Sequence, residues 1–68
     1  MTEKEIIEHA KFIKINEHKS NRECAEIAVN NCIKHPEEYF RETCALFDIT
    51  IEEAKQDYIN HIKRKLTI

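Results

Sequence analysis

No glycine occurs in this chain, and its single proline is Pro36. β-Hairpins depend on turns such as Asn-Gly and Asp-Gly, because those turns need residues that accept positive backbone angles. Neither dipeptide is present in the sequence. The sequence therefore predicts helices joined by short loops rather than a sheet.

Length and charge narrow the class of protein further. The chain has 68 residues, of which 41% are hydrophobic and 35% charged, and its formal net charge is −2. This length allows one small domain over residues 1–68, and the mixture is apolar enough to fold. The net charge supplies no overall positive field to attract nucleic acid. No apolar run approaches the roughly 20 residues that span a bilayer, and three cysteines form no disulfide framework, so we expect a cytoplasmic protein without membrane contact.

Three Ser/Thr-Glu pairs have the spacing of a capping box, the side-chain arrangement that begins many helices. They are Thr2 with Glu5, Ser20 with Glu23, and Thr50 with Glu53. The pairs predict helices over about 3–19, 21–34 and 51–66. Pro36 suits the first position of a helix and predicts a further one over 36–47. The predicted fold is all-α, a compact bundle of three to four short helices whose last two form a helix-turn-helix-like hairpin.

Apolar residues recur along each predicted helix at the spacing of one buried face. We expect the core to combine the isoleucines with the five aromatic side chains, Phe12, Tyr39, Phe40, Phe47 and Tyr58. Four apolar residues fall outside the stripes: Ile7, Phe12, Ile15 and Ile27. Large apolar residues that face water often mark an interface. Alternatively, a loop or a second buried face of the first helix covers them, and the sequence leaves both readings open.

Residues 42–66 have the layout of two helices crossing at a short turn. Cys44 is small enough for a crossing, and Phe47, Ile49 and Ala54 are apolar residues around the turn. The stretch resembles the helix-turn-helix of bacterial sigma factor region four and of LuxR-type output domains. The resemblance lies in the string Phe47-Asp48-Ile49-Thr50, then Glu52, Lys55-Gln56 and the closing Lys63-Arg64-Lys65-Leu66.

The resemblance implies that helix 50–66 binds the major groove of promoter or operator DNA. The side chains expected to reach DNA are Lys55, Gln56, Asn60, Lys63 and Arg64. This hypothesis predicts that the three basic ones, Lys55, Lys63 and Arg64, are exposed on one face of the helix. Recognition helices use basic and amide side chains for such contacts. The same helix also carries three carboxylates that would repel phosphates, at Glu52, Glu53 and Asp57.

Four residues are potential zinc ligands: Cys24, Cys32, His35 and Cys44. No Cys-x-x-Cys pair anchors them, and free cysteine commonly behaves as a small buried apolar residue. We therefore expect core cysteines, with no metal and no cofactor. No group of residues with assignable catalytic roles is evident, so the sequence favours neither an enzyme nor a small-molecule substrate.

Two functional hypotheses follow from these patterns. The first is a non-enzymatic regulatory or interaction protein, such as a small phage-type modulator of host machinery, that binds a protein partner or a second copy through a helical face. Its binding residues would be Ile7, Phe12, Ile15 and Ile27. The alternative is a DNA-binding transcriptional regulator that uses helix 50–66, and dimerisation would favour it by pairing two half-sites.

Overall fold

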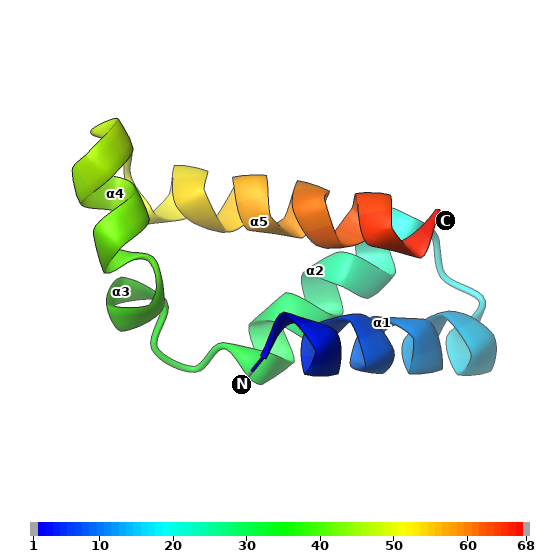
Figure 1. Ribbon diagram of the computed structural model, residues 1–68. Coiled ribbons are helices and arrows are strands. Elements are labelled where there is room, and N and C mark those ends of the chain that lie inside the picture. Colours follow the sequence, from blue (N-terminus) through cyan, green and yellow to red (C-terminus); the bar gives the residue numbers. More distant parts are fainter. Residues whose placement is uncertain (1, 68) are drawn as a thin grey trace.

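The computed structural model describes residues 2–67, which form five helices and contain no strand (Figure 1). In chain order the helices are α1 (Glu3–Glu17), α2 (Asn21–Cys32), α3 (Pro36–Tyr39), α4 (Arg41–Phe47) and α5 (Ile51–Leu66). The predicted all-α class is confirmed. Within the described residues, each helix is too short or too polar to cross a membrane.

The three longest helices begin where the capping pairs predict. Thr2 and Ser20 each accept a hydrogen bond from the backbone N–H three residues later, at 3.3 Å. Thr50 makes the full capping box, because its own N–H also donates to the Glu53 carboxylate at 3.2 Å. Each bond satisfies a backbone donor that has no partner within the first turn of a helix.

The helix ends differ from the predicted ones. α1 ends at Glu17 rather than Lys19, because His18 adopts the left-handed conformation with φ 54°. Asp48 ends α4 in the same way, with φ 51°. Glycine usually occupies such positions, and in its absence these two residues adopt the required positive φ. α2 ends at Cys32, two residues before the predicted Lys34.

The helix predicted over 36–47 is two helices, α3 and α4, separated at Phe40. Phe40 has φ −100° and ψ 9°, outside the range of a regular helix. Its side chain is buried and packs edge-to-face on Tyr39 and Tyr58, with ring centroids 4.8 and 5.8 Å apart. The prediction of one helix was wrong because tertiary packing of this ring interrupts a segment that is locally helical.

The core lies between α1, α2 and α5. α1 and α5 run in the same direction, and α2 runs back between them (Figure 1). The side of α2 in this core is formed largely by small residues, among them Cys24, Ala25 and Ala28. The buried residues of this core are Ile6, Ala10, Ile13, Cys24, Ala25, Ala28, Val29, Ile59, Ile62 and Leu66. Burial of these aliphatic side chains from three helices is the main stabilising contribution.

The aromatic part of the predicted core was largely wrong. Phe12 is 63% exposed, Phe47 65% and Tyr39 41%, whereas Phe40 is buried and Tyr58 half-buried. Phe12 follows the buried Ala10 by two positions, which turns it about 200° around the helix and away from the core. Phe47 ends α4, a helix without a buried residue.

α3 and α4 together form an arm at one end of the molecule, beside the first turns of α5 (Figure 1). We call residues 36–47 the α3–α4 arm. It touches the rest of the fold through α5, on which the Tyr39–Phe40–Tyr58 aromatic cluster packs. The molecule is consequently elongated, with principal extents of 36 × 18 × 16 Å.

Candidate protein-binding surface

The outer face of α1 exposes two large apolar side chains next to each other. Phe12 is 63% exposed and Ile15 is 73% exposed. They are three residues apart on one helix, about 60° around its axis, so their side chains are neighbours. We call these two residues the α1 patch. Neither is accounted for by packing within the described fold.

The other two predicted partner-binding residues lie elsewhere. Ile7 and Ile27 are half-buried and pack against the core. The first helix is therefore covered on two sides near Ile7 and exposed near the α1 patch. Ile7 is thus partly covered, as one of the two readings expects. Phe12 and Ile15 are exposed, and their role in an interface stays a prediction.

A second exposed apolar pair was missed at the sequence level. Leu46 and Phe47, at the end of α4, are 77% and 65% exposed. We call them the α4 patch. Phe47 was assigned to the core because it continues the stripe of Thr43 and Cys44, which are half-buried. The break at Phe40, which leaves α4 short and separate, has no local sequence signal that would have revealed this exposure.

Two of the five predicted DNA-contacting residues are engaged inside the protein. The Arg22 guanidinium, at the start of α2, donates to the Asn60 Oδ1 at 3.1 Å and to the Gln56 Oε1 at 3.2 Å. Both amides are half-buried beside α2. Bidentate readout of adenine uses the amide oxygen as well as the NH2 group, so it would compete with the bonds from Arg22.

The three basic candidates do not share an exposed face, contrary to the prediction. Lys55 is half-buried, whereas Lys63 and Arg64 are exposed. Lys55 and Arg64 are nine residues apart and so project about 180° from each other around α5. Of the apolar residues expected around the turn, Ala54 is buried and Ile49 half-buried, but Phe47 is exposed.

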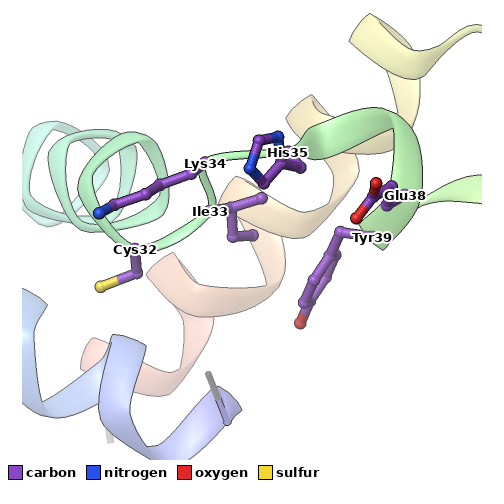
Figure 2. Close-up of a pocket in the computed structure, with 6 residues that line it drawn as sticks. All are labelled: Cys32, Ile33, Lys34, His35, Glu38 and Tyr39. Carbon is purple, nitrogen blue, oxygen red and sulfur yellow. The ribbon is translucent and has the colours of Figure 1, made fainter.

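A shallow hollow of about 430 Å³ lies between the end of α2 and α3 (Figure 2). Its lining residues are Cys32, Ile33, Lys34, His35, Glu38 and Tyr39. In Figure 2 the Cys32 side chain and the His35 ring point to different sides of the connecting segment. Within residues 2–67 no three His, Cys, Asp or Glu side chains are grouped to hold a metal ion.

The hollow carries little reactive chemistry. Burial, with a smaller contribution from the Glu5 carboxylate, raises the pKa of the Cys32 thiol. A raised pKa disfavours the thiolate, which is the form that attacks substrates and binds metals. The Tyr39 hydroxyl at the edge donates to the Tyr58 hydroxyl at 3.1 Å, and burial raises the pKa of Tyr58 far above the ordinary tyrosine value.

No family model, curated protein or solved structure matches this chain significantly. The resemblance of residues 42–66 to sigma factor region four stays a prediction.

The histidines that border the apolar stripes make contacts between helices. His61 on α5 pairs through Nε2 with the Glu3 carboxylate at the start of α1. The His9 Nε2 lies 3.4 Å from the Asn31 side-chain amide on α2. Both contacts join helices at the surface of the three-helix core, which gives these two side chains a structural role.

Proposed function

We propose that this chain is a non-enzymatic regulatory protein that acts by binding another protein through the α1 patch. The observation that carries the proposal is the exposure of Phe12 and Ile15, side by side on a helix whose opposite face is buried. Exposed apolar side chains of this size are typical of protein-binding surfaces, and aromatic residues are enriched where binding energy concentrates.

Two further features support binding over catalysis. The hollow between the end of α2 and α3 is shallow, and the cysteine that lines it, Cys32, has a raised pKa. Among residues 2–67, large exposed apolar side chains instead stand on helix surfaces, where they suit contact with another protein.

The alternative, a DNA-binding regulator that uses helix 50–66, has less support. Arg22 holds Gln56 and Asn60, and the first turn of α5 presents Glu52 and Glu53 to solvent. The feature that favours it is the basic run Lys63-Arg64-Lys65 at the end of α5. DNA binding of this kind would weaken steeply with salt. Absence of binding to random and genomic DNA at low salt would exclude it.

The test of the protein-binding proposal is co-purification of the tagged chain from nuclease-treated lysate, compared among three forms. These are the wild type, Ile15→Glu, and the matched control Asn30→Glu, which adds the same charge at an exposed position of α2. We expect a stoichiometric partner with the wild type and the control, and at least a tenfold loss with Ile15→Glu.

Circular dichroism of the three forms keeps the result interpretable. Ile15 is exposed, so its replacement should leave the helical spectrum unchanged. An unfolded Ile15→Glu would show that Ile15 supports the fold, and Phe12→Ser then serves as the second variant. Equal partner recovery with a folded Ile15→Glu and with the wild type would refute the role of the α1 patch.

A further inference from the structure

The charges of this molecule are separated along its length, although the net charge is only −2. One end combines residues 11–23 with residues 61–67, which lie together in Figure 1. Seven basic and two acidic residues there give a formal charge of +5. The opposite end, residues 36–57, carries seven acidic and two basic residues, a formal charge of −5. We call these the basic end and the acidic end.

Each end also carries one of the exposed apolar patches. The α1 patch belongs to the basic end: the exposed Lys11 lies about 40° from Ile15 around the helix, and the half-exposed Lys19 follows Ile15 by four residues. The exposed Glu8, one turn before Phe12, is the acidic residue beside the patch. The α4 patch belongs to the acidic end, where Glu42 precedes Leu46 by one helical turn and Asp48 follows Phe47 directly. Each end therefore presents an apolar centre with charged residues around it, which is the usual anatomy of a protein interface.

We propose that the α4 patch of a second copy of this chain occupies the α1 patch, so that copies associate head to tail. This inference rests on the proposed function and names the partner class. Contact between unlike ends brings a +5 surface to a −5 surface, which favours encounter and fixes the orientation. Contact between two α1 patches would instead oppose two basic surfaces, and contact between two α4 patches would oppose two acidic ones.

Head-to-tail contact uses two different surfaces, so each copy keeps a free basic or acidic end after one contact forms. Further copies add until the assembly closes as a ring, or it continues as an open chain. The molecule is narrow, 18 × 16 Å across, and small interfaces belong to the weak, reversible class. We expect a dissociation constant on the order of 100 µM.

The experiment is sedimentation velocity of the full chain from about 20 µM to 1 mM, a range that brackets the expected dissociation constant. The wild type should sediment as a monomer at the low end and exceed the mass of a dimer at the high end. Raising NaCl from about 0.05 to 0.5 M should reduce the association, because salt screens contacts between exposed charges.

Two charge variants and their mixture test the geometry. Ile15→Glu places a carboxylate in the basic end, and Leu46→Lys places an ammonium in the acidic end, so each alone should remain monomeric at 1 mM. Their equimolar mixture should associate, because one retains an intact acidic end and the other an intact basic end. Asn30→Glu and Asn30→Lys, with equal charge changes on α2, should behave as the wild type.

Three results would overturn the inference: a monomeric wild type at 1 mM, a mixture that stays monomeric, or Leu46→Lys that associates as the wild type does. The last would indicate a two-fold contact between α1 patches. The two experiments can also disagree, if the wild type sediments as a monomer while Ile15→Glu still fails to recover a different protein from lysate. That combination would refute self-association and leave the proposed function standing. An Ile15→Glu variant that behaves as the wild type in both experiments would refute both self-association and the proposed function.

Discussion

At the scale of single residues, the Tyr58 hydroxyl links stability to alkaline pH. Burial raises the pKa of Tyr58 in the folded chain, whereas an unfolded tyrosine ionises near about pH 10. The folded state therefore keeps a proton that the unfolded state releases. Its contribution to stability is complete below about pH 10 and decreases as the pH rises further. The raised pKa of Cys32 acts in the same direction from a lower starting pH.

The measurement is urea unfolding followed by circular dichroism at about pH 7, 9 and 10.5, values that bracket the ionisation of free tyrosine. The free energy of unfolding should decrease at the highest pH in the wild type. Tyr58→Phe keeps the ring contacts with Tyr39 and Phe40. Because it has no hydroxyl to ionise at this position, its free energy of unfolding should decrease less at the highest pH. Parallel decreases in the two proteins would assign the effect to other groups.

Residue identity predicted burial well for aliphatic side chains and poorly for aromatic ones. Ile6, Ala10 and Ile13 follow helical spacing, and all three are buried. Phe12 and Phe47 were assigned to the core together with the other aromatic side chains, and both are exposed. Position around the helix decided burial at Phe12, and the separation of α4 decided it at Phe47. The same rule explains why two of the four predicted binding residues, Phe12 and Ile15, are exposed.

At the scale of elements, the capping box at Thr50 should be the most valuable of the three helix starts. It begins α5, which supplies Ala54, Ile59, Ile62 and Leu66 to the interior. Thr50→Ala removes the acceptor for the Glu53 N–H and should cost about 1 kcal/mol of unfolding free energy. Thr50→Ser keeps that acceptor and serves as the control. Equal stability of the two variants in urea unfolding would contradict the role of this cap.

Helix starts could be predicted from sequence because a cap is a contact between residues three apart. Thr2, Ser20 and Thr50 each make theirs without help from the rest of the fold. The break at Phe40 depends on Tyr58, which is eighteen residues away, and no local pattern contains it. The two exposed apolar patches differ in the same respect: one could be predicted from local sequence and the other could not. The α1 patch followed from helical spacing, but the α4 patch depends on how the α3–α4 arm packs on α5.

At the scale of the whole molecule, stability should come mainly from the three-helix core and hardly at all from the exposed end of α4. Ile59 is fully buried between helices from both halves of the chain, whereas Leu46 is 77% exposed. Ile59→Ala should cost about 2–4 kcal/mol through lost burial and the cavity that remains. A core this small supplies roughly 3–5 kcal/mol in total, so the variant should be largely unfolded at 37 °C.

Thermal unfolding followed at 222 nm, the helical band, distinguishes the two regions. Leu46→Ala should change the free energy of unfolding by less than about 0.5 kcal/mol, as is usual for exposed positions. Ile59→Val should fall between the two alanine variants, at about 0.5–1.5 kcal/mol. A Leu46→Ala variant as unstable as Ile59→Ala would place the arm within the cooperative core. If Leu46 contributes little to stability, its exposure together with that of Phe47 is better explained by binding to another protein.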